Sequence, residues 1–486
     1  LWKRLMNQDP ISFSPKLPWQ PIQPENVTQQ TPGAQEDSSQ LRLNLPLFVF
    51  FGLFTSFVWW FIFEYEKGAE LIAASYFIVL AFIGTLMLLR RNMIGALMLV
   101  AYLSVLQPTF RAYSQILPYL ALEYLVILWA ILTLLVQPRR LPLSAPILFY
   151  SAYLLLELSG TVFSKSPNLM RGVLVPSSAL GFTLLISTRI RINHSQLNNI
   201  LTAYLIGALN LAMIISLNYL NGATIHWGSD SNLDAAGGMG PNQIASLLGI
   251  GVIICIIFFE ESSQPGKWLL LFPTAWMAFL MLLTFSRTGL ALVIIALLIY
   301  YGVFQANRLR SFTSLILLSL LGALIFMQVV DVTGQAAVNR YTDLSPTNRL
   351  DLARYGWQLF LNNPLFGVGT GNFHLYMEST AYFGQTSGAH NELIRAAAEH
   401  GILGIVFWSG FAISSLWLAH QSAAGKARAI RILFLAICFA YTFTSGLKLM
   451  TQPLLLLLAC SALLPEEPEE VDAPWAYPIS REQEVH

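Results

Sequence analysis

The chain has 486 residues, of which 55% are hydrophobic and only 11% are charged. Because a soluble domain carries roughly 25% charged residues, this composition excludes a soluble protein and indicates a polytopic membrane protein. The net charge of +1 argues against nucleic acid as a partner. Cys255, Cys438 and Cys460 all lie in apolar runs, so they predict neither a disulfide nor a metal framework.

The chain begins and ends with polar segments. Residues 1–43 contain several prolines and show no cleavable signal peptide. They are predicted to form a disordered cytoplasmic tail, and the acidic residues 465–486 are predicted to form a second one.

Between these tails the sequence alternates apolar runs with short polar connections. A spanning helix needs about 20 apolar residues, with ~17–25 tolerated. Fourteen runs approach this length: 44–63, 70–89, 92–107, 115–136, 143–159, 173–187, 197–219, 242–259, 267–284, 288–304, 312–331, 400–420, 428–445 and 450–464. The chain thus divides into transmembrane helices over 44–331, a long polar loop over 332–395, and further transmembrane helices over 396–464.

Positive charge in the short connections predicts the orientation. Alternate connections are rich in basic residues: Arg90, Arg91, Arg139, Arg140, Arg189, Arg191, Lys267, Arg308, Arg310, Lys426, Arg428 and Arg431. The other short connections hold fewer: Lys67, Arg111, Lys165, Arg171, Arg287 and Lys448. Since cytoplasmic loops carry the excess of Lys and Arg, both termini are predicted inside and the 332–395 loop outside.

Several basic residues therefore lie on the disfavoured outer side. Arg111, Lys165 and Arg171 are predicted to pair with Glu123 and Glu157, which lie near the outer ends of their helices. Carboxylates at that depth usually face the bundle interior, where they pair or function.

Arg287 lies between two apolar runs with almost no loop, in Phe285-Ser286-Arg287-Thr288-Gly289. One interpretation is a snorkelling arginine at a helix end. The other is an anion clamp, because a guanidinium is always charged and can bind a phosphate through two hydrogen bonds.

The long loop contains a predicted helix that starts near Arg349, ends before Pro364, and is followed by Gly367, Gly369 and Gly371. Its predicted apolar stripe comprises Leu350, Ala353, Trp357, Phe360 and Leu361. Arg349 lies at the edge of this stripe, so a helix lying flat on the membrane would direct it inward. The alternative is an ordinary surface charge. The glycines permit tight turns, but without a flanking strand they are a weak phosphate-loop signal.

His390 precedes a predicted helix over 391–400, in which Glu392, Arg395 and Glu399 are spaced for ion pairing and Gly401 is the stop. The positive end of the helix dipole disfavours imidazolium, and a neutral imidazole is what a general base requires. A structural histidine is the alternative, and His374 and His400 compete for the role. Zinc is not expected, because the sequence is not His-Glu-x-x-His and offers no external cysteine pair.

Asn242 follows Pro241 at the start of a span, where it is either an N-cap or a donor to a sugar or phosphate. Together with the motif residues, a wider polar set is predicted to bind substrate: Asn242, Ser286, Asn391, Glu392, Arg354 and Arg171.

These motifs occur in one order: Pro241-Asn242, Phe285 to Gly289, Arg349 before Asn363-Pro364-Leu365-Phe366-Gly367-Val368-Gly369-Thr370-Gly371-Asn372-Phe373, and His390-Asn391-Glu392-Leu393 before Glu399 to Gly404. Over about residues 241–404 the chain resembles the O-antigen ligase and O-antigen polymerase superfamily of membrane glycosyltransferases. One departure from the superfamily is the number of spans: fourteen apolar runs are predicted here, whereas about twelve spans of ~20 residues are usual there.

The resemblance implies an all-α, GT-C-like polytopic protein with about 12–14 transmembrane helices and one long periplasmic loop containing short helices. It implies a multi-pass protein of the bacterial inner membrane that transfers a glycan from undecaprenyl diphosphate to lipid A-core or another glycan. Transfer would invert the anomeric carbon and need no metal, nucleotide sugar or other cofactor. By motif, His390, Arg287 and Arg349 take the catalytic positions.

The resemblance leaves the ligase and polymerase branches open, and some relatives glycosylate proteins. A membrane transporter is the alternative from another class, because some cyanobacterial relatives carry a label of inorganic carbon transport. A transporter would be expected to contain paired ionisable residues near the membrane midplane and broken helices in two related halves.

Overall fold

The structure is a computed structural model. It describes residues 42–65, 68–136, 143–221, 225–228, 230–263, 265–304, 307–343, 348–378, 389–422 and 426–464. The predicted tails lie outside these ranges except for residues 42 and 43, as do Lys67, Arg139 and Arg140.

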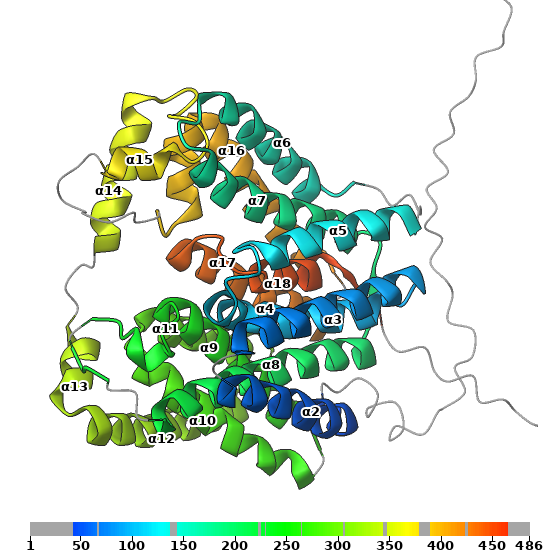
Figure 1. The fold of residues 1–486 in the computed structure, drawn as a ribbon, viewed down its shortest axis with the longest axis vertical. Helices are drawn as coiled ribbons and strands as arrows, with labels where there is room; N and C mark the ends of the chain where they lie inside the picture. Colours follow the sequence, from blue (N-terminus) through cyan, green and yellow to red (C-terminus); the bar gives the residue numbers. More distant parts are fainter. Residues whose placement is uncertain are drawn as a thin grey trace, which may run out of the picture. The chain divides into compact units, whose positions relative to one another are not determined.

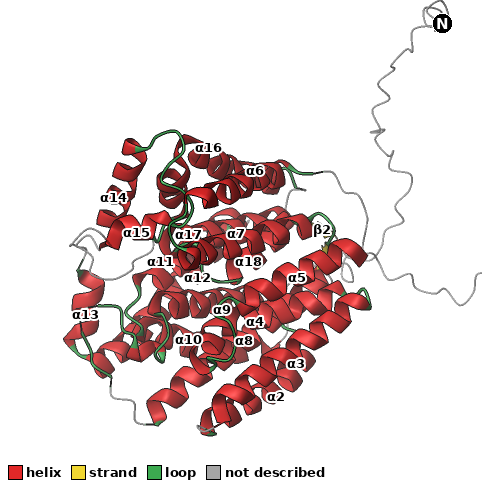
Figure 2. Cartoon of the chain, turned by 45° about the horizontal axis from the view of Figure 1, so that its top comes forward, coloured by secondary structure: helices red, strands yellow, loops and turns green. Residues whose placement is uncertain are grey.

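The described chain is almost entirely helical (Figure 2). Its first helices are α2 (Leu45–Glu64), α3 (Ala69–Leu89), α4 (Met93–Tyr113), α5 (Ala121–Val136), α6 (Ala145–Gly160), η3 (Thr161–Phe163), α7 (Pro167–Ser187) and α8 (His194–Leu220). The middle of the chain forms η4 (Asp234–Ala236), α9 (Pro241–Glu261), η5 (Pro265–Leu270), α10 (Leu271–Leu283), α11 (Arg287–Ile299), η6 (Tyr300–Phe304) and α12 (Arg308–Thr333). The remaining helices are α13 (Gln335–Thr342), α14 (Asn348–Asn362), α15 (Asn372–Glu378), α16 (Glu392–His420), α17 (Lys426–Ser445) and α18 (Thr451–Cys460).

Each of the fourteen apolar runs corresponds to helical structure. In the described part of the chain, eleven helices are long and apolar enough to cross a membrane. The other three runs form shorter apolar helices, at Ala121–Val136, Arg287–Val303 and Thr451–Cys460. The prediction of an all-α, multi-pass membrane protein is therefore confirmed.

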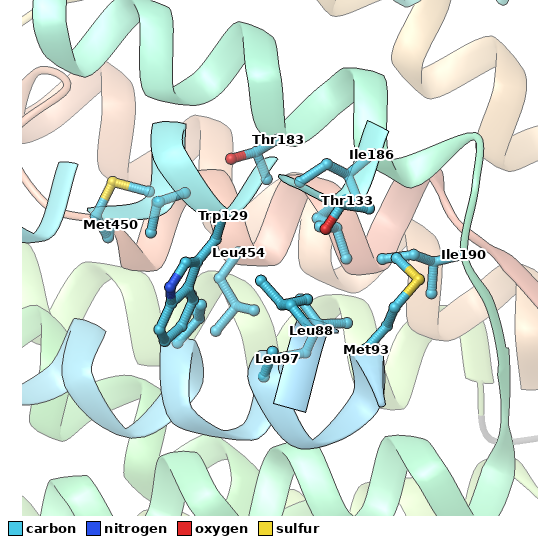
Figure 3. A pocket seen from close by; sticks show the side chains of 14 residues that line it. Leu88, Met93, Leu97, Trp129, Thr133, Thr183, Ile186, Ile190, Met450 and Leu454 are labelled. Atoms are coloured by element: carbon cyan, nitrogen blue, oxygen red, sulfur yellow. The ribbon is translucent and has the colours of Figure 1, made fainter. Parts of the chain in front are cut away.

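The helices pack around a buried centre. Most of the length of α4, α8 and α9 is buried, whereas α2 and α12 expose most of their apolar surface. Figure 3 shows an apolar pocket of about 450 Å³ in this packing, lined by α3, α4, α5, α7 and α18 and lacking charged residues. Arg287, Arg349 and His390 are not among the residues that line it.

The described part of the long loop forms short helices. In Figure 1, α14 and α15 lie near each other at the upper left and α13 lies at the lower left beside α12, all on the same side of the molecule. α14 ends at Asn362, before Pro364, as predicted. Gly367, Gly369 and Gly371 all have positive φ angles, of 67°, 93° and 77°.

The face of α14 that packs against the rest of the protein is not its predicted apolar stripe. Leu352, Gly356 and Leu359 are the buried residues of this helix, whereas the side chains of Leu350 and Trp357 are 43% and 46% exposed. Gly356 decides the packing, because a Cβ there would overlap Ile394 of α16 and lie 2.9 Å from Phe373. A helix face with a glycine at its centre does not form an apolar pattern in the sequence. The missing side chain nevertheless permits neighbouring side chains to approach the helix backbone most closely.

The opposite ends of the helices carry a short parallel pair of strands, β1 (Arg191–Asn193) and β2 (Ala462–Leu464). Glu260 at the end of α9 binds Arg310 of α12, with 3.0 Å between Oε2 and Nη2. The described residues of the arginine- and lysine-rich connections thus gather at the end remote from α13–α15.

Candidate active site at the outer loop

Arg287 is held by a tight turn between α10 and α11. Phe285 at this turn is buried and has a φ of 55°, in the left-handed region. The Arg287 guanidinium donates through Nε and Nη2 to the carbonyl oxygen of Arg340, at 3.1 and 2.8 Å. Its Nη2 also lies 3.9 Å from Asp343 Oδ2, and its side chain is 28% exposed. The group is therefore fixed at one edge and open to solvent at another.

Arg340 of α13 is a further basic residue of this site. Its Nε donates to the Phe285 carbonyl oxygen at 2.9 Å, so two arginines each bind the other's segment. Burial and the nearby Arg287 lower the pKa of Arg340. Arg340 was not predicted from the sequence, because nothing but proximity in the fold relates α13 to the α10–α11 turn.

Arg349 of α14 points inward, as predicted. Its Nη1 donates to Thr288 Oγ1 at 3.0 Å, one residue after Arg287. Burial, followed by the nearby charge of Arg340, lowers the pKa of Arg349. The structure thus brings Arg287, Arg340 and Arg349 together from α11, α13 and α14, a concentration of positive charge that favours an anion.

Asn242 joins this site, but not as an N-cap. Gly240 is the N-cap of α9, and the Asn242 Oδ1 atom instead accepts a hydrogen bond from Ser286 Oγ at 2.7 Å. The α9 and α11 helices approach closely because of Gly289, whose added Cβ would lie 2.6 Å from the Ala245 carbonyl oxygen. Asn242 and Ser286 therefore lie directly beside Arg287.

His390 has an unusual backbone and a protected imidazole. Its φ of 51° is left-handed, and such strained residues cluster at functional sites. Its Nδ1 atom is buried without a hydrogen-bond partner among the described residues. Burial lowers the pKa of His390 to about 3, with contributions from the charges of Lys448 and Arg349. The imidazole is therefore neutral near pH 7, as a general base requires.

His390 lines a cavity of about 460 Å³ with His374, Glu392 and Lys448. Burial, followed by the charge of Lys448, lowers the pKa of His374 to about 4. The competing residue His400 lies elsewhere, with its ring edge against Tyr153 at 5.8 Å between centroids. It is almost fully buried and is not among the residues that line this cavity.

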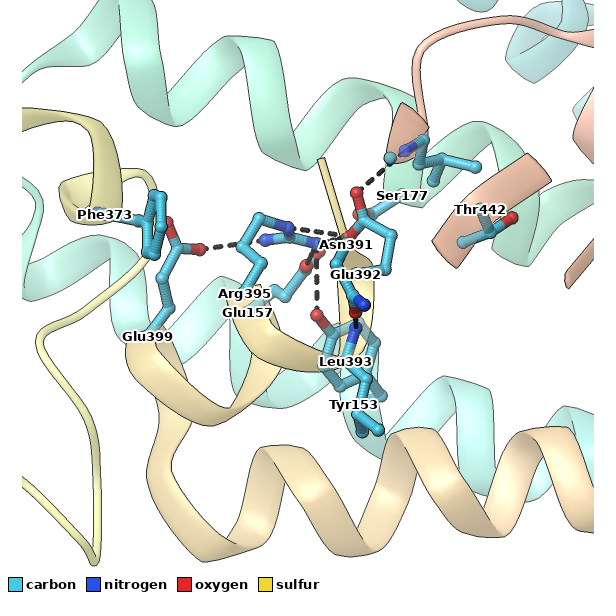
Figure 4. A network of polar contacts seen from close by, with 12 residues as sticks. Tyr153, Glu157, Ser177, Phe373, Asn391, Glu392, Leu393, Arg395, Glu399 and Thr442 are labelled. Carbon is cyan, nitrogen blue, oxygen red and sulfur yellow. Dashed lines mark hydrogen bonds and ion pairs between the residues drawn. The ribbon is translucent and has the colours of Figure 1, made fainter. Parts of the chain in front are cut away.

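A buried ion cluster fixes the helix that follows His390. Figure 4 shows Arg395 surrounded by carboxylates from two helices. Its guanidinium binds Glu392, Glu399 and Glu157 at 2.7, 2.8 and 2.7 Å, and also donates to the Tyr153 hydroxyl at 3.1 Å. The predicted pairing within 392–399 is confirmed.

The predicted partners of the outer carboxylates are correct for one pair only. Arg111 binds Glu123 at 2.8 Å. Glu157 instead binds Arg395, because both side chains are buried between α6 and α16. Lys165 lies over the Tyr376 ring at 5.1 Å.

The glycine-rich turn binds α16 rather than presenting free amides. Val368 N and Gly369 N donate to the carbonyl oxygens of Ala398 and Glu399, both at 2.9 Å. A Cβ at Gly367 would overlap the backbone of Glu399 and His400. Helix geometry breaks at Gly401, where φ is 63° and ψ is −146°, as the stop prediction requires. The turn therefore caps the first segment of α16, which leaves the weak phosphate-loop signal without support.

The remaining predicted binding residues have varied surroundings. Asn391 Oδ1 caps α16 by accepting from Leu393 N and Ile394 N, at 3.0 and 3.1 Å. Glu392 Oε1 accepts from Leu447 N at 2.8 Å. Arg354 binds Asp351 at 3.3 Å on an exposed part of α14, and Arg171 is exposed on α7.

A second large cavity lies among α9, α10, α11 and α12. Its volume is about 990 Å³ and its lining is almost wholly apolar. Tyr341 belongs to this lining and donates its hydroxyl to the Leu282 carbonyl oxygen at 2.9 Å. Because Tyr341 directly follows Arg340, the apolar cavity and the arginine cluster adjoin each other. In the described part of the chain, no group of three or more His, Cys, Asp or Glu residues is placed to hold a metal ion.

The fold and the site define a multi-pass, all-α membrane protein with a cationic cluster and a neutral histidine at one end of its spans. Residues 272–409 match the family model described as O-antigen ligase. This match includes Arg287, Arg340, Arg349 and His390. No curated protein matches the chain.

The match over residues 272–409 supports the resemblance to the O-antigen ligase superfamily seen in the motifs. The matched domain supports a glycosyltransferase-type activity of the ligase or polymerase kind. Its substrates are expected among lipid-linked glycans, in keeping with a protein whose helices occupy the membrane.

Proposed function

We propose that this protein transfers a glycan from undecaprenyl diphosphate to an acceptor hydroxyl at the periplasmic face of a bacterial inner membrane. In the proposed ligase reaction, the acceptor is lipid A-core. The alternative within the superfamily is a polymerase whose acceptor is another lipid-linked glycan. The observation that carries the proposal is the convergence of Arg287, Arg340 and Arg349 from three helices, with the charge of Arg349 acting on His390.

The donor is proposed to lie with its polyprenyl chain in the cavity of α9–α12. That cavity is apolar and adjoins the arginine cluster through Tyr341. The diphosphate would then contact Arg287 and Arg349, with Asn242 and Ser286 beside it. Preorganised positive charge at the leaving group stabilises the transition state in a partly dehydrated site.

His390 is proposed to act as the general base. It would take the proton of the acceptor hydroxyl while the acceptor oxygen bonds to the anomeric carbon. The bond from that carbon to the phosphate oxygen breaks on the opposite side, which inverts the configuration, and the lipid diphosphate leaves. Two guanidinium groups supply the charge for which other enzymes use a metal, so the proposal includes no metal or cofactor.

The periplasmic location rests on charge. The connections rich in Arg and Lys lie at one end of the bundle, and α13–α15 lie at the other. By the positive-inside rule the basic end is expected to be cytoplasmic, which supports termini inside and the site outside.

The test uses purified protein, a glycan on undecaprenyl diphosphate, and either lipid A-core or a second donor molecule as acceptor. We expect H390A and R287A to fold but to transfer glycan about 10²–10⁴-fold more slowly, the range for loss of a general base or a charge-stabilising group. R287K should also be impaired, because Lys cannot bind through two parallel hydrogen bonds.

The control is R308A, which removes an arginine at the other end of the bundle, where it binds the Gly302 carbonyl oxygen. It should leave transfer unchanged. Near-wild-type rates in both H390A and R287A would refute the assignment. The anchor and length of the product distinguish ligase from polymerase.

A further inference from the structure

Lys448 lies in the short connection between α17 and α18, far in sequence from every motif discussed above. This connection packs against the start of α16. Gly446 has a φ of 70°, and a Cβ added to it would lie 3.1 Å from Glu392 Oε1 and 4.0 Å from His390 Cα. The glycine therefore permits the α17–α18 connection to touch the histidine segment.

Hydrogen bonds fix this connection from several sides. Leu447 N donates to Glu392 Oε1 at 2.8 Å, and Lys448 N donates to Gln452 Oε1 at 3.3 Å. The Lys448 carbonyl oxygen accepts from Arg111 Nη1 at 3.3 Å. The backbone of Lys448 is thus positioned by α4, α16 and α18 together. A solvated surface lysine would not require a backbone held by contacts from three helices.

The Lys448 side chain lines the same cavity as His390, His374 and Glu392. Its ammonium has no hydrogen bond or ion pair among the described residues. Glu392 is the nearby carboxylate, but its two oxygens already bind Leu447 N and the Arg395 guanidinium. Burial lowers the pKa of Lys448; the charge of Glu392 opposes this, and the charges of Arg349 and Arg111 add to the lowering. A cation in such surroundings is costly unless an anion joins it.

We propose that Lys448 binds an anionic group of the substrate, a phosphate or a carboxylate, in the cavity beside His390. This inference rests on the proposed function. An ammonium is a compact charge with three rotatable donors, which suits a phosphate held as a point contact. The anion is either the diphosphate of the donor, reaching across from Arg349, or an acidic group of the acceptor. The site then has positive charge on both sides of the imidazole.

The experiment measures two quantities on purified protein in detergent micelles: the affinity for undecaprenyl diphosphate alone, and the KM for donor and acceptor titrated separately. K448M keeps the length of the side chain and removes its charge. We expect a loss of roughly ten- to a hundred-fold in one of these quantities, the range for one charge-assisted hydrogen bond. K448R should recover most of the loss because it restores the charge.

The variants distinguish the source of the anion. A loss of affinity for undecaprenyl diphosphate identifies the donor, whereas a raised KM for acceptor alone identifies the acceptor. K267M is the matched control, since Lys267 is a connection lysine at the opposite end of the bundle, where it lies over Phe259.

Two results overturn the inference: unchanged affinity and KM values in K448M, or an equal loss in K448M and K448R. R287A in the same assay separates this outcome from failure of the proposed function. If R287A weakens binding and K448M does not, only the role of Lys448 is refuted. If R287A also binds the lipid diphosphate normally, the proposed function fails.

Discussion

At the scale of the residue, the proposed chemistry depends on keeping one imidazole neutral. His390 feels the charges of two cationic side chains, Lys448 and Arg349, and is partly withdrawn from water. Both effects disfavour the imidazolium form. The same cations suit a diphosphate, so in the proposed mechanism one charge arrangement would serve both substrate binding and base catalysis.

This arrangement determines a pH dependence. The pKa of His390 is lowered to about 3, so the neutral base is lost only as the pH falls far below the ordinary value of about 6.5. We expect kcat/KM for glycan transfer, which reports the free enzyme, to show no acid limb near that ordinary value. Initial rates at low substrate between pH 5 and pH 8 (roughly the range spanned by ordinary histidines) measure this.

The control for this expectation is K448M. Removal of the neighbouring charge raises the pKa of His390, so the acid limb should move to higher pH than in the wild type. A wild-type limb near the ordinary histidine value, unmoved by K448M, would contradict the argument.

At the scale of the element, the glycine-rich turn and the first segment of α16 form one unit. The turn caps the carbonyl ends of Ala398 and Glu399, and Arg395 ties the same segment to Glu157 of α6. His390 precedes this segment directly. Its position therefore depends on contacts that involve neither substrate nor any other candidate catalytic residue.

We expect G367A to disrupt this unit. A Cβ at Gly367 would overlap the backbone of Glu399, and a φ of 67° is itself unfavourable for alanine. Displacement of α16 by about 1 Å can lower a rate ~10²-fold, so transfer should fall by at least about tenfold. The measurement is the transfer rate together with thermal stability.

G238A is the matched control for the turn. Gly238 has a similar φ of 75°, but nothing lies within 4 Å of an added Cβ. It should cost only the backbone strain, roughly 1–2 kcal/mol, and keep its transfer rate. Equal rates in the two variants would show that the turn does not position the site.

At the scale of the whole molecule, the candidate site lies where the apolar cavity among α9–α12 adjoins the helices of the long polar loop. The cavity among α9–α12 is apolar and adjoins the arginine cluster through Tyr341 and Arg340. This continuity matches a lipid diphosphate, whose apolar chain and charged head need such an arrangement in one binding site.

Filling the cavity tests this continuity. Gly322 of α12 lines it, and nothing lies within 4 Å of a Cβ added there. We expect G322F to raise the KM for a long polyprenyl diphosphate donor by about tenfold, the loss of roughly two buried methylene groups, with little change for a short-chain donor. G302F, at an equally open glycine near the other end of the bundle, should change neither KM. An unchanged KM in G322F would place the lipid chain elsewhere.

Hydropathy predicted the helices because a spanning segment must be apolar over a fixed length whatever its neighbours are. Charge and motif order likewise indicated Arg287, Arg349 and His390. The errors concern packing. Asn242 is not an N-cap, because Ser286 from another helix occupies its side chain. The packing face of α14 is centred on Gly356, because a residue without a side chain permits Phe373 and Ile394 to approach the helix closely.

The sequence by itself determined that the chain is an all-α, multi-pass membrane protein, that its long loop holds a helix and a glycine-rich turn, and which superfamily it resembles. These properties follow from composition, period and local backbone preference, which are encoded over short stretches. Only the tertiary structure decided that Arg340 and Lys448 join the site, that Glu157 binds Arg395, and that the glycines cap α16. Those contacts join residues from different helices, often hundreds of positions apart, and electrostatic and packing energies depend on distance in space rather than along the chain.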